Sequence, residues 1–334
     1  MNDVVRKIEE RASRANKRIV LPESGDARVI RAAGMITQRN YAKVVLLGRE
    51  DAIRRAAREL KVDLSGVEIV DHLTDGRREQ YVQQLAARRK AKGMTADQAD
   101  ELLRQSVYYG GMLVGDGRVD GMVAGSICPT RDTVRSALYG VGLAEGVRIV
   151  TACSVVNTIV PEVGVGGSLI FADTGVVPEP TAEDLADIAI AAAGACKALL
   201  QAEPYVAMLS FSRKGSAHSP AVQKVIDATN LVRSRRKDLK VDGELQVDAA
   251  VVPDVARRKV SGSEVAGRAN TLIFPDLSCA NIGYKLVERL GNAVPLGPLL
   301  QGLARPVNDL SRGCDEQEIA LIAAITAIQA GPGG

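Results

Sequence analysis

The 334-residue chain contains no tryptophan, and aromatic residues make up only 3% of it. Proteins that bind single-stranded nucleic acid use aromatic side chains as stacking platforms, so this scarcity argues against such a role. The net charge is only +3 and the basic residues are scattered, which gives no support for a nucleic-acid partner. No apolar run reaches the roughly 20 residues needed to cross a bilayer, so we expect no membrane partner.

Histidine and cysteine are also scarce. His72 and His218 are the only two histidines and lie far apart, which excludes a site built on several imidazoles. Proton transfer is therefore expected to use a carboxylate, Lys, Tyr or Cys. The five cysteines are widely spaced and form no CxxC pair, a pattern typical of reduced thiols rather than of disulfides or a zinc site. Together with an N-terminus too charged for a secretory signal, this predicts a cytoplasmic protein.

Short apolar runs alternate with helical patterns along the chain. Residues 18–24 are typical of a buried strand, a helix follows directly, and residues 42–48 are strand-like again. A similar rhythm resumes after residue 147. This order predicts an α/β fold with largely parallel sheets, and the length predicts two domains.

Two helix starts are marked by specific residues. Thr181 and Asp184 are spaced as a capping box, and they open a strongly helical stretch at residues 180–201. Pro220 stands at the first position of another helical pattern. Both features predict where a helix begins.

Polar loops follow two of the expected strands. Ser126 and Thr130 come after the strand-like residues 119–125, and Lys214 comes after residues 205–211. Hydroxyls, glycine and cations just ahead of a helix suit a phosphate, because free backbone N–H groups point outward there. We therefore expect Thr130, Ser126 and Lys214 to bind phosphate. The alternative interpretation is that these residues only cap helices and form solvated turns.

A third polar stretch lies near the C-terminus, at residues 305–314. It reads RPVNDLSRGC, so a hydroxyl, a guanidinium and a thiol stand close together at Ser311, Arg312 and Cys314. An almost purely apolar run follows it. A buried cysteine is the more common role for such a thiol than a nucleophile.

Nine stretches, in order, resemble the phosphate acetyltransferase (phosphotransacetylase) family over nearly the whole chain. They read RIVLPESGDARVIRAA, RRKAKGMT, VYYGGMLV, VDGMVAGS, PTAEDLADIAIAAA, VAMLSFSRKGSA, DGELQVDAA, FPDLSCANIGYKLVERLG and GPLLQGLARPVNDLSRGC. The resemblance implies reversible conversion of acetyl-CoA and phosphate into acetyl phosphate and CoA. CoA would then be a substrate, and no cofactor or metal is implied.

The resemblance also implies an architecture. The family has two doubly wound α/β domains with a cleft between them, as in isocitrate and isopropylmalate dehydrogenases, and its members are typically homodimers. We expect residues 1–147 together with residues 315–334 to form the first domain, and residues 148–314 to form the second.

Three catalytic residues are implied by the same likeness. Ser311 and Arg312 match the family's catalytic serine and arginine, suited to stabilise an oxyanion and to hold a phosphoryl group. The family's general base is an aspartate seven residues after the serine, and Glu318 occupies that position here. Asp315 lies nearer and is the alternative base. Both acids would also favour the start of a helix through its dipole, with no catalytic role.

Arg89 and Arg135 match two arginines that the family uses to bind CoA phosphates, which arginine can hold in bidentate fashion. The chain departs from the family at Cys128 and Pro129, where a His and a hydroxyl residue are usual, so the shape of the acyl pocket is open. Other functions stay open too: an acyltransferase for propionyl or butyryl groups, a non-catalytic module that senses acetyl-CoA, and a metal-dependent NAD(P)-linked dehydrogenase. The last needs clustered aspartates that the sequence does not offer.

Overall fold

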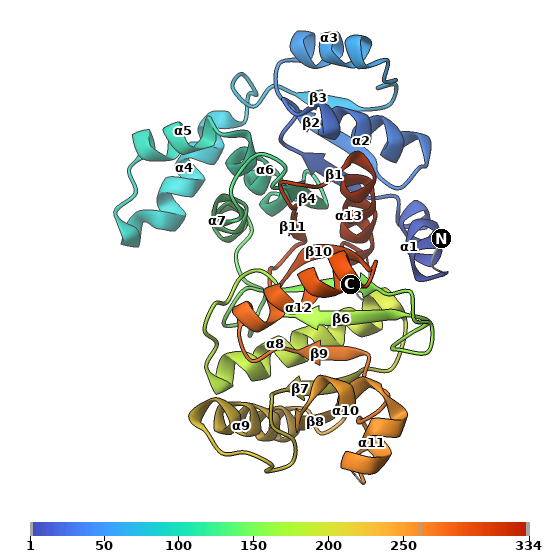
Figure 1. Cartoon of the computed structure of the whole chain (residues 1–334). Coiled ribbons are helices and arrows are strands. Elements are labelled where there is room, and N and C mark those ends of the chain that lie inside the picture. The colour runs from blue at the N-terminus through green and yellow to red at the C-terminus, as the bar shows by residue number, and fades with distance from the viewer. Residues whose placement is uncertain (1–2, 261, 332–334) are drawn as a thin grey trace. The chain divides into compact units, whose positions relative to one another are not determined.

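The computed structural model describes residues 3–260 and 262–331. The polypeptide forms most of one α/β unit, continues into a second unit and then returns to the first (Figure 1). One unit consists of Lys7–Arg148 and the chain from Leu303 onward, and the other of Ile149–Gly302 and the chain up to Arg6. The predicted α/β class is confirmed. The return begins earlier than predicted, because residues 303–314 include a strand that belongs to the sheet of the first unit.

The first unit contains a five-stranded sheet in the order β11–β4–β1–β2–β3, and all neighbouring strands run parallel. Its strands are β1 (Arg18–Leu21), β2 (Lys43–Leu47), β3 (Glu68–Val70), β4 (Gly121–Ala124) and β11 (Val307–Asp309). Its helices are α1 (Asp3–Ala15, from Lys7 in this unit), α2 (Ala27–Gln38), α3 (Glu50–Leu60), α4 (Arg78–Arg89), η1 (Lys90–Lys92), α5 (Ala96–Leu103), α6 (Ser106–Gly115), α7 (Thr130–Gly140) and α13 (Glu316–Gln329).

The second unit contains a six-stranded sheet in the order β10–β5–β6–β9–β7–β8. Strand β5 runs antiparallel to both of its neighbours, and the other pairs are parallel. Its strands are β5 (Thr151–Asn157), β6 (Ser168–Ala172), β7 (Tyr205–Leu209), β8 (Lys240–Leu245), β9 (Thr271–Ile273) and β10 (Val294–Gln301). Its helices are α8 (Ala182–Ala195), η2 (Cys196–Leu200), α9 (Pro220–Arg235), α10 (Val247–Val251), α11 (Pro253–Lys259) and α12 (Leu277–Leu290).

Both predicted helix starts in the second unit are confirmed. The Thr181 hydroxyl accepts from the Asp184 backbone N–H at 3.2 Å, and the Asp184 carboxylate accepts from the Thr181 N–H at 3.1 Å. Pro220 is the first residue of α9. The glycine-rich segment before β6 forms the turn of the β5–β6 hairpin. Gly164 has a φ of +65° there, and a Cβ would lie 2.3 Å from the Ser168 carbonyl oxygen, so only glycine fits.

Helix α13 anchors the returning segment in the core of the first unit. Its side chains from Ile319 to Ile328 are almost all buried, because the helix packs against α2 and β4. Figure 1 shows α13 in red beside α2 in blue. The apolar run at the C-terminus therefore forms a buried helix rather than a surface one.

Strand β11 determines where Ser311 and Arg312 lie. It pairs in parallel with β4, with Asp309 opposite Ala124. The loops that follow these two strands, residues 125–129 and 310–315, therefore start side by side at the carboxyl edge of the sheet. This is the edge where ligands bind in open α/β sheets.

Within residues 3–260 and 262–331, no helix is long and apolar enough to cross a membrane.

Candidate active site

The segment with Ser311 and Arg312 forms a short exposed turn between β11 and α13. The Ser311 carbonyl accepts from the Cys314 backbone N–H at 3.0 Å, and its hydroxyl oxygen accepts from the Gly313 N–H at 3.3 Å. Both Ser311 and Arg312 are exposed, whereas Cys314 is buried beneath them. The hydroxyl and the guanidinium are thus presented at the surface, and the thiol is not.

Arg312 reaches across to the neighbouring loop. Its Nη1 donates to the Cys128 carbonyl at 3.1 Å, and both Nη1 and Nη2 lie 3.3 Å from the Thr130 hydroxyl oxygen. The structure therefore brings together Ser311, Arg312 and Thr130, which the sequence assigned to one site.

A carboxylate that the sequence did not reveal holds this loop in shape. Glu23, just after β1, is buried and accepts four backbone N–H groups, those of residues 125–128, at 2.6–2.9 Å. The Ser126 hydroxyl donates to the same carboxylate at 3.0 Å and is itself buried. The backbone N–H groups of this loop and the Ser126 hydroxyl were expected to bind phosphate. In the structure they donate to the Glu23 carboxylate instead.

Arg28 ties the two loops together from the first turn of α2. Its Nη1 donates to the carbonyls of Arg312 and Cys314, both at 2.8 Å, and its Nη2 donates to the Ser126 carbonyl at 3.0 Å. The Asp26 carboxylate holds the guanidinium from the other side, with 2.7 Å between Oδ2 and Nη2. Arg28 thereby fixes the spacing between the loop of Ser126 and the loop of Arg312.

Two thiols flank the site, and both are poor nucleophiles. Burial raises the pKa of Cys128 to about 12, with the charge of Glu23 contributing further. Burial and the nearby charge of Glu318 raise the pKa of Cys314 to about 11. The thiolate is the reactive form of cysteine, so neither residue is activated near neutral pH.

Asp315 and Glu318 have different surroundings. Asp315 is the N-cap of α13, and its Oδ1 accepts from the Glu318 backbone N–H at 2.8 Å. The Glu318 side chain is half-buried and close enough to Cys314 for its charge to raise the pKa of that thiol. The helix-start role weighed for both acids is therefore filled by the Asp315 side chain.

Arg89 and Arg135 lie on two helices that pack together, α4 and α7. The Arg89 guanidinium stacks on Tyr139, with 4.3 Å between Cζ and the ring centroid, and Tyr139 follows Arg135 by one helical turn. Arg135 is exposed, with its Nη1 4.0 Å from Asp132 Oδ1. The two predicted CoA-binding residues thus lie on neighbouring helices of the first unit.

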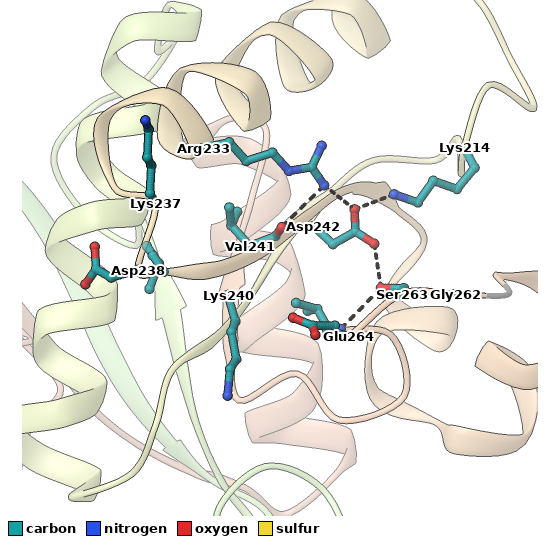
Figure 2. A pocket seen from close by; sticks show the side chains of 12 residues that line it. Lys214, Arg233, Lys237, Asp238, Lys240, Val241, Asp242, Gly262, Ser263 and Glu264 are labelled. Carbon is teal, nitrogen blue, oxygen red and sulfur yellow. Dashed lines mark hydrogen bonds and ion pairs between the residues drawn. The ribbon is translucent and has the colours of Figure 1, made fainter.

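Lys214 belongs to the second unit and has an acidic partner there. It lines a pocket of about 540 Å³, in which its ammonium pairs with the buried Asp242. Arg233 and Ser263 converge on the same carboxylate, as Figure 2 shows. The Lys214 ammonium would have to leave Asp242 to bind phosphate, so that assignment stays a prediction.

The rest of this second loop also surrounds a carboxylate. Glu244 is buried in β8 and accepts from the Ser212 hydroxyl at 2.8 Å and from the Gly215 N–H at 2.9 Å.

The part of the chain that the structure describes holds no group of three His, Cys, Asp or Glu side chains placed to bind a metal ion.

Comparison with known proteins gives one consistent result. Residues 3–327 match the family described as phosphate acetyl/butaryl transferase. A phosphate acetyltransferase from Acetivibrio thermocellus is 50% identical over 321 residues, which cover 96% of each chain. A phosphotransacetylase from Streptococcus pyogenes has a crystal structure that superposes with a TM-score of 0.89, at 39% identity and 98% coverage of both chains. EutD phosphotransacetylase from Staphylococcus aureus gives 0.88, with the same identity and coverage.

The Glu23 carboxylate provides the first test of this site. We expect Glu23→Gln to lower the free energy of unfolding by at least about 2 kcal/mol, because a single amide oxygen cannot accept from all the buried N–H groups, and each one left unsatisfied costs about 1–3 kcal/mol. Urea denaturation measures this, and amide exchange at residues 125–128 should become faster. Glu59→Gln, at an exposed position of α3, is the control. Equal stability of the two variants would show that Glu23 does not hold the loop.

Proposed function

Because the chain belongs to the phosphate acetyl/butaryl transferase family, we propose that it transfers an acetyl group reversibly between coenzyme A and inorganic phosphate. The observation that carries this proposal is the exposed Ser311–Arg312 turn, held beside the Thr130 loop. The chain also covers 96% and 99% of two phosphate acetyltransferases that it resembles. The products are acetyl phosphate and free CoA. The catalytic turn favours an enzyme over a module that only senses acetyl-CoA.

The chemistry needs a thiolate, because the CoA thiol has an ordinary pKa of about 8.5 and only its deprotonated form attacks well. We assign Glu318 as the base that accepts this proton. The sulfur then forms a bond to the acetyl carbon, and the bond from that carbon to the phosphate oxygen breaks. In the reverse direction Glu318 returns the proton to the departing sulfur. Asp315 is less suited, since one of its oxygens already caps α13.

Ser311 and Arg312 serve the transition state. The Ser311 hydroxyl can rotate to donate to the carbonyl oxygen as negative charge develops there, a service worth roughly 3–4 kcal/mol in comparable sites. The Arg312 guanidinium holds the phosphate in a fixed orientation beside Thr130. Ser126 and Lys214 have weaker support as phosphate ligands, because Glu23 and Asp242 already engage their polar groups.

Coenzyme A enters as a substrate, and the proposed mechanism uses no other cofactor and no metal. Its phosphates suit Arg89, whose guanidinium stacks on Tyr139, and Arg135, one helical turn before Tyr139 on α7.

We also propose that the protein acts as a homodimer in the cytoplasm. Ile282, Leu286 and Leu290 recur every four residues on α12, and they are 60%, 52% and 79% exposed. A second copy, related by a two-fold axis, would cover this apolar stripe with its own. A monomeric mass in sedimentation at micromolar concentration would contradict the dimer.

The proposed location in the cytoplasm rests on the cysteines. All five are free thiols, as expected in a reducing compartment.

The direct test of the activity is to measure thiol consumption when the purified protein meets acetyl phosphate and CoA. We expect CoA thiol to disappear as acetyl-CoA forms, and we expect free thiol to appear when acetyl-CoA meets phosphate. Propionyl and butyryl phosphates tested in parallel give the acyl preference, because one methylene changes discrimination by only about 1–3 kcal/mol. Binding of acetyl-CoA without any turnover would support the sensing alternative instead.

The assignment of the base is tested by Glu318→Gln. We expect kcat to fall by about 10²–10⁴-fold with little change in either KM, because only a transition-state service is lost. Raising the pH should partly restore the rate, since solvent then supplies the thiolate. Ser311→Ala should also lose kcat, but without this rescue. Asp315→Asn is the matched control and should keep most of the rate. If Asp315→Asn loses activity while Glu318→Gln keeps it, Asp315 is the base.

The CoA site is tested by Arg89→Ala and Arg135→Ala. Each should raise the KM for CoA roughly tenfold, as expected for the loss of a charge-assisted hydrogen bond, with a smaller change for acetyl phosphate. The effect should shrink with dephospho-CoA if the contact is to the 3′-phosphate. Arg54→Ala, at an exposed position of α3, controls for the loss of a surface charge. Parent-like KM values for CoA in both variants would remove these residues from the site.

A further inference from the structure

Asp309 is a buried carboxylate beside the catalytic turn, and the mechanism above gives it no role. It is the last residue of β11, two positions before Ser311, and only 1% of it is exposed. Its Oδ2 accepts from the Thr130 hydroxyl at 2.6 Å. Its Oδ1 faces the backbone of Gly125, where a Cβ would lie only 2.3 Å away, and it accepts no hydrogen bond from the described residues.

The hydroxyl of Thr130 links this carboxylate to Arg312. A threonine hydroxyl has one proton to donate, and the short bond to Asp309 uses it. The oxygen of Thr130 can then only accept, and both Nη atoms of Arg312 lie 3.3 Å from it. The three side chains therefore form a chain of hydrogen bonds that runs in one direction, from the guanidinium through the hydroxyl to the carboxylate.

Burial and the groups around Asp309 act on its pKa in opposite senses. Burial raises its pKa above the ordinary value, and the hydroxyls of Thr130 and Thr133 and the positive charge of Arg312 offset only part of this rise. Ionised, the carboxylate is an acceptor only, so it always takes the proton of Thr130. Glu23 is the other negative charge near it, and its oxygens are engaged by the backbone of residues 125–128.

We propose that Asp309 is a positioning residue that fixes the guanidinium of Arg312 through the hydroxyl of Thr130. This inference rests on the proposed acyl transfer. It reassigns Thr130, whose proton is committed to Asp309 and is not offered to phosphate. Arg312 then keeps Nε and one Nη2 hydrogen for the substrate, because its bonds to Cys128 and Thr130 use the other donors.

The test is a double-mutant cycle. Asp309→Asn should lower kcat roughly tenfold to a hundredfold, as expected when a catalytic group is misplaced by about 1 Å, and it should leave the KM for CoA unchanged. In an Arg312→Ala background the same change should lower kcat by less than about twofold, because the group that it positions is absent. If Arg312→Ala is too slow to measure, Arg312→Lys takes its place. An equal loss in both backgrounds would overturn the proposal.

Thr130 variants repeat the test without touching the buried charge, in case Asp309→Asn does not fold. Thr130→Val should lose as much kcat as Asp309→Asn, whereas Thr130→Ser should keep most of the kcat. The double variant Thr130→Val/Asp309→Asn should have a kcat no lower than that of the slower single variant. If the fold-losses in kcat of the two single variants multiply in the double variant, Asp309 does not act through Thr130 and the proposal is contradicted.

Ser136→Ala is the structural control, since this buried hydroxyl also supports α7 by donating to the Thr133 carbonyl. It should lower the unfolding midpoint without lowering kcat. A loss of kcat as large as that of Thr130→Val would mean that Asp309 and Thr130 only hold the helix start. Absence of turnover in the parent protein would instead refute the proposed function, before any variant is compared.

Discussion

The carboxyl edge of the first unit's sheet, where Ser311 and Arg312 lie, depends on one buried carboxylate. Removing the charge of Glu23 from water costs several kcal/mol unless donors replace the lost hydration, and five donors from residues 125–128 do so. Because four of them are backbone N–H groups, the bond network determines the path of the loop itself. That path places the Cys128 carbonyl and Thr130 where Arg312 can reach them.

The same solution recurs in the second unit. Glu244 receives the Ser212 hydroxyl and the Gly215 N–H, and Asp173, directly after β6, receives the N–H groups of residues 175–177. In each case a carboxylate in or directly after a strand accepts hydrogen bonds from a neighbouring loop. The sequence pattern predicted phosphate at the loops of Ser126 and Lys214, and in the structure their polar groups bind carboxylates of the protein itself.

Local patterns predicted the parts of the fold that depend on local physics. Periodicity located β1, α2 and β2, and side-chain spacing located the start of α8 at Thr181. Strand β11 was missed because three residues give no periodicity and only pairing with β4 makes them a strand. Glu23 and Arg28 were missed as well, since their partners lie about a hundred residues or more away. Both residues lie in the RIVLPESGDAR stretch, which was used only for the family resemblance and gave neither of them a role.

Because the chain returns to the first unit, the sheet of that unit can be completed only late in synthesis. A ribosome makes residues 149–302 before it makes β11, so β4 has an unpaired edge throughout that time. An open strand edge is a template for wrong pairing, and the nascent chain is exposed to aggregation until the last strand arrives. Ser311 and Arg312 come just after β11, so the proposed catalytic groups arrive with the segment that closes this edge. A nascent chain interrupted before β11 would lack Ser311 and Arg312, and its β4 edge would stay open to wrong pairing.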